Sequence, residues 1–172
     1  MSSLISEYAP EAFRDIVLTH YASNPNYYEM NASGKRTHLW RKLSGTGGHI
    51  TVIMKSPCTA LEKNDHTVTC LINRLSEVSD YSCMSLINIQ DGYEWRENLK
   101  MLINLYKTDV LIAWGSKVRN SISTRKLRIE LKTKCCNTNI LEFHKEGSKG
   151  EHTVIGLKKN TQLHLWDSNL KR

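Results

Sequence analysis

The sequence lacks the features of several common protein classes. Cysteine occurs at five positions, an odd number, and no two cysteines form a C-x-x-C pair. This pattern indicates neither a disulfide framework nor a zinc or iron–sulfur site. Cys58, Cys70 and Cys83 are instead expected to be small buried hydrophobic side chains. The histidines also show no metal-ligand spacing with acids or thiols, so no metal site is predicted.

Long apolar runs are absent too, and no apolar stretch of the chain is long enough to span a bilayer. Residues 1–15 contain acidic side chains and no apolar signal core. We therefore expect a cytoplasmic protein with no membrane partner. No G-x-G-x-x-G or G-x-x-x-x-G-K-[ST] motif follows an expected strand, so a dinucleotide or P-loop site is not predicted.

Negative charge is the scarcer sign. The chain carries 24 Lys and Arg against 17 Asp and Glu, a formal net charge of +7. A basic balance favours a polyanionic partner, with nucleic acid the first candidate. The alternative is charge that serves only solubility. Residues 117–134 hold much of the excess, with one acid, Glu130, beside Lys117, Arg119, Arg125, Lys126, Arg128, Lys132 and Lys134.

What the chain does have is the composition of one globular domain. Its 172 residues, 40% hydrophobic and 24% charged, suit a single domain that covers residues 1–172. Short apolar runs rich in β-branched residues predict buried strands. These runs are Ile50–Met54, Cys83–Ile89, Asp109–Trp114 and Asn139–Phe143, with a last short strand at Thr153–Leu157 and either a strand or a helical turn at Lys35–Leu43.

Helical spacing separates these strands. Asp65 is placed to cap a helix that runs to Val78, with apolar side chains at helical intervals from Val68 to Leu75. Further helices are expected at 10–20, at 95–106 and, with a basic face, between 117 and 132. Strands that alternate with helices predict an α/β fold, with a central parallel sheet and helices on both faces.

Three of the expected strands end at Ser56–Cys58, Asn88–Gln90 and Trp114–Ser116. In open α/β sheets the carboxyl ends of parallel strands lie along one edge, where ligands bind. An ordinary strand-to-helix connection is the simpler interpretation of each segment alone.

The ordered set of these segments resembles a known family. The order and spacing of a small bacterial and phage family, known as domain of unknown function 1643, are matched by five segments: MKSPCTA, NDHT, LINIQ, EN and AWGSK. Its pattern runs Leu-Asn-Pro-Ser, Asp-Pro-Thr, Asn-Leu, Asn-Asp, Ala-Trp-Gly and a late His-Pro. KRTHLWRKL looks like the opening of that family, and the resemblance covers roughly residues 35–166.

The family pattern is in turn similar to that of uracil-DNA glycosylases. The resemblance implies that Ser56-Pro57-Cys58 lines a base pocket and that Asn88 reads the edge of uracil. It also matches Trp114-Gly115 to a Trp-Gly that the next strand of those enzymes carries, and it places His164 over the scissile bond. The implied fold is a three-layer α/β sandwich, and the implied protein is a monomer that needs no cofactor.

This sequence departs from the glycosylase pattern at three positions. Ser56 stands where the classical enzymes have the aspartate that positions water, and serine can hold a water but cannot act as its base. Leu165 follows His164 in place of proline. Cys58 stands where those enzymes carry an aromatic side chain that excludes thymine. Asp65 is either a helix cap or a residue that helps to place the water.

The residues therefore predict two alternative functions. One is a monofunctional glycosylase that hydrolyses deoxyuridine in DNA, with Asn88, His164, Ser56 and Asp65 at the reaction centre; another damaged base is a possible substrate. The other is a non-catalytic nucleic-acid-binding module with the same fold. Substrate contacts are predicted for Met54, Lys55, Pro57, Cys58, Thr67, Trp114, Gly115 and Ser116, and phosphate contacts for Lys117, Arg119, Arg125, Lys158 and Lys159.

For three of these residues a structural role is the alternative. Asn88 could bond a turn at the end of its strand, and His164 could be an ordinary surface histidine. Trp114 is more often a core residue than a stacking platform at such a position. The structure bears on each of these choices.

Overall fold

The fold was analysed in a computed structural model of the full chain. The structure describes residues 26–30, 32–34, 36–55, 60–89, 99, 108–115, 122–134, 138–144, 153–155, 157 and 161–166. The helix expected at 10–20 lies outside these residues, as does the helix expected at 95–106 except for Leu99.

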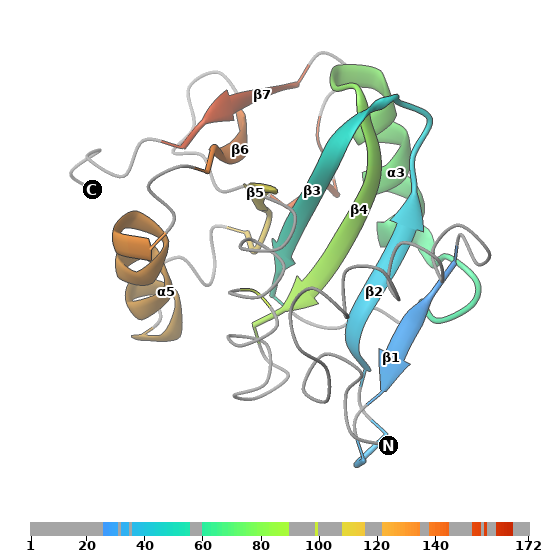
Figure 1. The fold of residues 1–172 in the computed structure, drawn as a ribbon, viewed down its shortest axis with the longest axis horizontal. Coiled ribbons are helices and arrows are strands. Elements are labelled where there is room, and N and C mark those ends of the chain that lie inside the picture. Colours follow the sequence, from blue (N-terminus) through green and yellow to red (C-terminus); the bar gives the residue numbers. More distant parts are fainter. Residues whose placement is uncertain are drawn as a thin grey trace.

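The described residues form a mixed α/β protein built on one seven-stranded sheet, with strand order β1-β2-β4-β3-β5-β6-β7 (Figure 1). β3 lies at the centre and pairs in parallel with both β4 and β5. The elements are β1 (Tyr28–Met30), β2 (Arg36–Lys42), β3 (Gly47–Met54), α3 (His66–Val78), β4 (Tyr81–Asn88), β5 (Asp109–Ile112), α5 (Ile122–Lys134), β6 (Ile140–His144) and β7 (Gln162–Leu165).

The sheet is only partly parallel. β4, β3, β5 and β6 form the parallel centre that the buried runs predicted, but β1, β2 and β7 pair antiparallel at its two sides. The expected parallel sheet is therefore present at the centre, and antiparallel strands extend it at both edges. The segment at 35–43, left open between strand and helical turn, is the strand β2.

The last predicted strand was wrong. Thr153, Val154, Ile155 and Leu157 are not in a strand; Val154 is buried in the core, and the N–H of Leu157 donates to its carbonyl at 3.5 Å. The last strand is instead β7, which pairs with β6 on the side away from β5 and lies where no strand was predicted. In this segment Val154 is buried while Ile155 is 52% exposed, so the burial of Val154 is not accompanied by backbone pairing.

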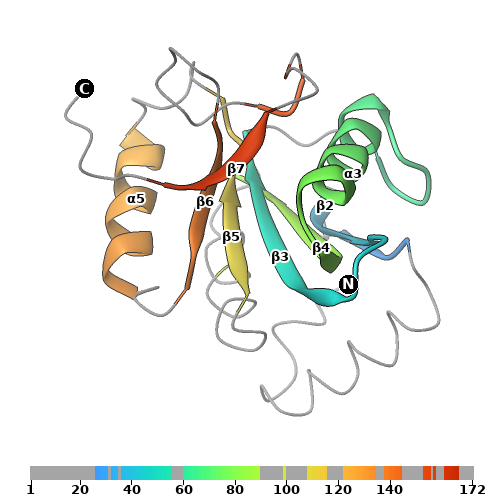
Figure 2. The same cartoon turned by 90° about the horizontal axis from the view of Figure 1, so that it is seen from above.

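Side chains of the central strands alternate between two apolar clusters, as the pleat of a sheet requires. Ile50, Val52 and Met54 pack with α3 through Val68, Leu71 and Leu75. Ile53 and Ile112 belong to a second cluster, which contains Leu127 and Leu131 of α5. The view in Figure 2 shows α3 and α5 on different sides of β3 and β5.

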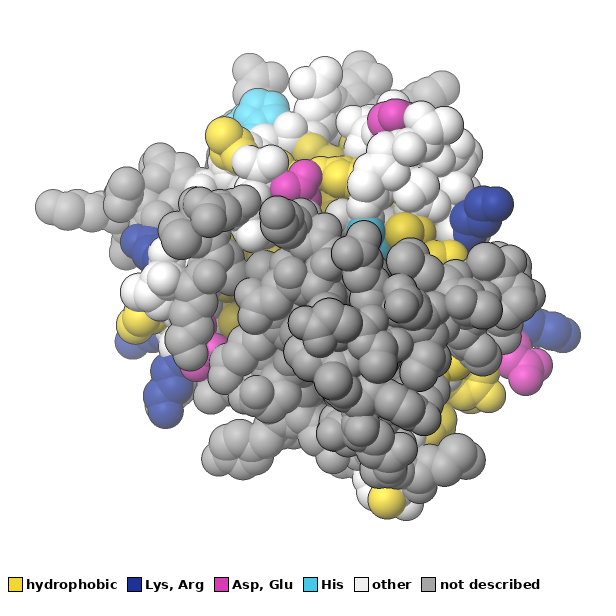
Figure 3. Space-filling model, in the orientation of Figure 1, with side chains coloured by type: hydrophobic (Ala, Val, Ile, Leu, Met, Phe, Trp, Pro, Cys, Tyr) yellow, Lys and Arg dark blue, Asp and Glu magenta, His cyan; other side chains and the backbone are white. Residues whose placement is uncertain are grey.

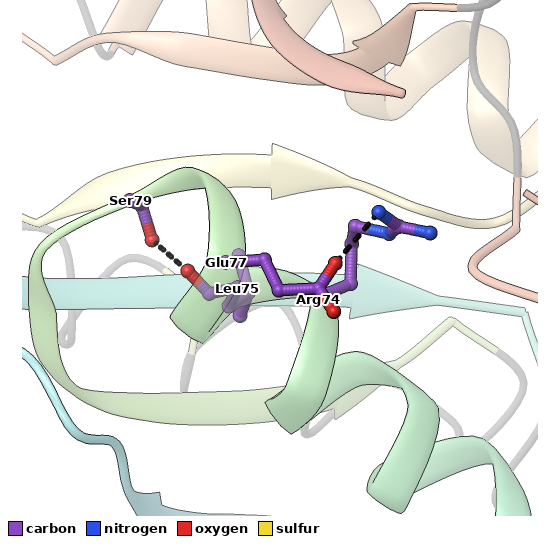
Figure 4. Close-up of polar contacts among 4 residues, drawn as sticks. All are labelled: Arg74, Leu75, Glu77 and Ser79. Atoms are coloured by element: carbon purple, nitrogen blue, oxygen red, sulfur yellow. Dashed lines mark hydrogen bonds and ion pairs between the residues drawn. The ribbon is translucent and has the colours of Figure 1, made fainter. Parts of the chain in front are cut away.

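The helix α3 forms where the sequence predicted it. The Asp65 carboxylate accepts from the N–H of Val68 at 2.9 Å, which satisfies one of the free donors of the first turn. At the other end the Ser79 hydroxyl donates to the carbonyl of Leu75 at 2.6 Å, and Arg74 pairs with Glu77 at 2.8 Å (Figure 4). Both ends of the helix are thus closed by local side chains.

A buried polar cluster lies on the strand face opposite α3. His49 Nε2 is 2.7 Å from Ser85 Oγ, and His49 Nδ1 is 3.0 Å from Thr108 Oγ1. Thr108 Oγ1 also donates to the carbonyl of His49 at 2.8 Å. A serine beside a histidine can be an activated nucleophile. Ser85, however, is fully buried in the middle of β4, so the cluster joins β3, β4 and the residue before β5 and is not a reaction centre.

Both histidines of this region resist protonation. Burial lowers the pKa of His49 to about 3, with His38 as a second cause. Burial likewise lowers the pKa of His38 to about 3, with the positive charge of Arg36 as a second cause. Each ring is therefore neutral in the folded protein over the whole range in which a histidine of the unfolded chain takes up a proton.

This difference makes the protein less stable in mild acid. Between pH 6.5 and pH 3 the unfolded state binds protons that the folded state refuses, so the free energy of unfolding falls with pH by up to about 1.4 kcal/mol per pH unit for each histidine. We expect this fall between pH 6.5 and 5 in urea titrations. His49→Gln should reduce the slope, whereas Asn73→Gln, at an exposed position of α3 that carries no titratable group, should not. A parental slope in His49→Gln would contradict the assignment.

Candidate functional site

The candidate site lies at the carboxyl edge of the sheet, which we define as the ends of the parallel strands β4, β3, β5 and β6. The chain leaves β3 through α3 toward β4 on one side, and leaves β5 through α5 toward β6 on the other. The ends of β3 and β5 are neighbours, since Ile53 pairs with Ile112 and the N–H of Ala113 donates to the carbonyl of Ile53 at 2.9 Å. Ligands in open α/β sheets bind at such a switch point.

Asn88 ends β4 at this edge and is 2% exposed. It pairs with Met54, the last residue of β3, and the N–H of Ile89 donates to the carbonyl of Met54 at 2.9 Å. Paired residues share a face of the sheet, so Asn88 lies on the α3 side together with the buried Met54. A buried side-chain amide at a strand end can both donate and accept a hydrogen bond to a bound ring.

Trp114 and Gly115 follow β5. Trp114 is 2% exposed and belongs to the α5 cluster, so in this structure it is a core residue. The guanidinium of Arg128 lies over its ring, with Cζ 5.7 Å from the ring centroid. Gly115 is buried with φ +84°, a conformation that costs other residues about 1–2 kcal/mol. The Trp-Gly pair thus builds the turn at the end of β5.

Two buried arginines of β2 hold the chain between β3 and α3. Arg36 Nη1 donates to the carbonyl of Ala60 at 2.6 Å. Arg41 donates through Nη2 to the carbonyl of Leu61 and through Nε to Asn64 Oδ1 at 2.6 Å. Neither arginine was predicted from the sequence to be a site residue. The signal would have been two arginines, five residues apart, in a strand that also carries the apolar Leu39 and Trp40.

Arg41 makes two further bonds, to the carbonyls of Trp40 at 2.7 Å and Tyr27 at 3.2 Å. It is 1% exposed, so its charge is stabilised by backbone and amide oxygens rather than by water. These contacts connect β1, β2 and residues 60–64, and they lead directly to the N-cap Asp65. The conformation of residues 60–64, which we call the candidate loop, therefore depends on β2.

Asp65 fits the capping role. Its backbone is extended, with φ −82° and ψ 179°, its carboxylate accepts from Val68, and its carbonyl accepts from Thr69 at 2.9 Å. Thr67 lies in the first turn of α3 and is partly exposed. Lys55 is exposed directly after β3.

His164 lies elsewhere on the sheet. It is an exposed residue of β7 that pairs with Glu142 and stacks on His144, with ring centroids 4.3 Å apart. Three strands separate β7 from β4, which places their backbones about 19 Å apart at the usual strand spacing. Glu142 pairs with Ile112 of the α5 cluster, so His164 is also on the opposite face from Asn88. The structure does not bring these two candidates together.

Several predicted site residues lie outside the described part of the chain, and their placement stays a prediction. They are Ser56, Pro57, Cys58, Ser116, Lys117, Arg119, Lys158 and Lys159. Of the predicted phosphate contacts, Arg125 is described and is exposed on α5. Cys70 and Cys83 were expected to be buried but are partly exposed.

Among the residues that the structure describes, no three His, Cys, Asp or Glu side chains gather as a metal site. None of the described helices has the length and apolar character needed to cross a membrane.

Comparison with protein-family models, with curated proteins and with solved structures finds no match for this chain. The resemblance to the domain of unknown function 1643 and to uracil-DNA glycosylases therefore stays a prediction from the sequence.

The arginine contacts at the candidate loop give a stability prediction. Arg41→Gln should lower the free energy of unfolding by about 2–4 kcal/mol, because hydrogen bonds to a charged group are lost and buried carbonyls are left without a donor. The matched control is Arg74→Gln, which breaks the ion pair with the half-exposed Glu77 and should cost less than about 1 kcal/mol. Equal losses in urea denaturation of the two variants would refute the role given to Arg41.

Proposed function

We propose that this protein is a monofunctional uracil-DNA glycosylase, which hydrolyses the N-glycosidic bond of deoxyuridine in DNA. The observation that carries the proposal is the position of Asn88, a buried amide at the carboxyl end of β4 next to the switch point between β3 and β5. The order of the sequence motifs along residues 35–166 supports it as well. The protein would act as a cytoplasmic monomer without a cofactor.

The proposed fold is the three-layer sandwich of the glycosylases. The separation of the apolar core into one cluster with α3 and another with α5 supports this arrangement. The loop at residues 60–64, held by Arg36 and Arg41, would form one wall of the base pocket, and the turn at Trp114-Gly115 would form another.

The proposed reaction begins when deoxyuridine leaves the DNA stack, at a cost of a few kcal/mol. Asn88 would accept from N3–H and donate to O4 of uracil, which selects this base by its edge. The C–N bond then breaks heterolytically: uracil takes the bonding electrons, and an oxocarbenium-like sugar remains. A water molecule, positioned by Ser56, by a main-chain group or by Asp65, then adds to this cation and loses its proton to solvent.

The geometry changes one part of the predicted mechanism. A base that contacts Asn88 cannot also contact His164. The two residues lie on opposite faces of the sheet, and three strands separate β4, which carries Asn88, from β7, which carries His164. In the proposal, stabilisation of the uracil anion therefore falls to Asn88 and neighbouring main-chain donors. His164 is given no part in bond cleavage.

The alternative is a nucleic-acid-binding module that kept the fold and has no glycosylase activity. Two observations favour it: Ser56 replaces the classical aspartate, and the histidine is remote from Asn88. Binding without base release would identify this alternative.

A release assay on uracil-containing single-stranded DNA distinguishes the two functions. We expect release by the parent protein and a loss of at least about hundredfold in Asn88→Ala, the usual effect of removing a donor to a developing anion. Asn73→Ala, at an exposed position of α3, is the control and should keep the parental rate. Failure of the parent to release uracil from DNA that it binds would reject the glycosylase.

Asp65→Asn tests how the water is placed. Asparagine also caps a helix well, so the melting temperature should stay within the error of the measurement. Because the carboxylate is already used by the cap, we expect single-turnover release to fall by less than about tenfold. A fall of more than about a hundredfold at an unchanged melting temperature would make Asp65 a catalytic base.

A further inference from the structure

The described surface contains a pair of stacked imidazoles. His144 ends β6, His164 lies in β7, and both residues are exposed. Their ring centroids are 4.3 Å apart and their planes differ by 10°. Across the antiparallel ladder His144 pairs with Gln162 and His164 pairs with Glu142, so the two rings are diagonal neighbours on one face of the sheet.

This geometry suits stacking better than metal binding. A metal ion bound by an imidazole lies in the plane of the ring, and the two planes here are nearly parallel and separated. One ion cannot lie in both planes in this arrangement. A flat group can instead continue the stack on the outer side of either ring.

The basic helix α5 lies beside the histidine pair. Trp166 lies on the same face of the sheet as His164, and the backbone N–H of Trp166 donates to the carbonyl of Ile140 at 2.7 Å. Trp166 and Ile140 pack against the cluster that contains Leu127 and Leu131 of α5. Figures 1 and 2 accordingly show α5 next to β6 and β7.

The outer surface of α5 is positively charged. Arg125, Lys126 and Lys132 are exposed, and Glu130 is the single acid in the helix. Figure 3 shows Lys and Arg side chains gathered on the side of the molecule where α5 lies. Arg125 and Lys132 are seven residues apart, two turns along one stripe of the helix, so these charges extend over about 10 Å.

We propose that the His144–His164 stack and the outer surface of α5 together bind single-stranded nucleic acid. An unpaired base stacks on the imidazole pair, and the neighbouring phosphates contact Arg125, Lys126 and Lys132. Aromatic rings beside a basic track are the usual means of binding an unpaired strand. Bases inside a duplex already stack on both sides, so the histidine pair selects single strands. The inference uses the proposed nucleic-acid partner but does not depend on base release.

The test measures binding of a fluorescent oligonucleotide without uracil, in single-stranded DNA, single-stranded RNA and duplex DNA. His164→Ala should weaken single-strand binding by about 5-fold to 150-fold, the effect of losing one stacked base. His164→Phe keeps a flat ring and should retain most of the affinity, whereas His66→Ala on α3 should change nothing. Duplex binding should not respond to His164→Ala.

A second pair of variants tests the helix. Arg125→Gln and Lys132→Gln should each reduce the log–log dependence of single-strand affinity on salt by about 0.7. Lys42→Gln, at the exposed end of β2, serves as the control with an equal change of charge. An unchanged salt dependence in both helix variants would remove α5 from the binding surface and overturn the proposal.

Two other results would overturn the stacking role. One is an equal loss in His164→Phe and His164→Ala, which would show that the ring is not used for stacking. The other is an equal loss of single-strand and duplex affinity. The oligonucleotide carries no uracil, so intact single-strand binding without uracil release from the matched substrate would reject the glycosylase alone.

Discussion

The parallel pairing of β3 with both β4 and β5 is the constraint on which the rest of the structure depends. The last five residues of β3 are buried, and their side chains point alternately to the face of the α3 cluster and to the face of the α5 cluster. A shift of one residue would exchange the two faces, so the register is strongly determined. The same register sets Met54 opposite Asn88 and Ile53 opposite Ile112. The residues of the candidate site therefore reach one edge because the core fixes where their strands end.

The antiparallel strand β2 completes this edge. A chain segment that leaves a buried parallel strand carries backbone carbonyls that need hydrogen-bond donors. Arg36 and Arg41 supply such donors from β2 to residues 60 and 61, and Asp65 then accepts from the first turn of α3. Loop shape at the candidate site is thus determined by a neighbouring strand and by the helix that follows, more than by the loop residues themselves.

Prediction from the sequence succeeded where one local cause decides the structure. Continuous apolar runs mark strands buried on both faces, which identified β3, β4 and β5, and the Asp65 cap identified the start of α3. It failed for 153–157 and for β7, because the apolar character of a short segment does not determine whether its backbone pairs in a sheet. Val154 is buried without a strand, whereas the exposed Leu165 lies in one. The buried polar contacts of His49 and Arg41 depend on partners far along the chain.

The sequence could not show that His164 and Asn88 lie apart, for a different reason. Motif order along a chain does not determine strand order across a sheet, and β7 returns antiparallel at the far edge. Asn88 consequently faces α3, while His164 faces the side of α5. If Asn88 reads a base and the histidine pair holds another, the bound strand must pass over the carboxyl edge from one face to the other. Trp114 and Gly115 lie on that route, and the Trp114 ring already packs beneath Arg128 of α5. The turn after β5 is then the point at which base reading and strand binding would meet.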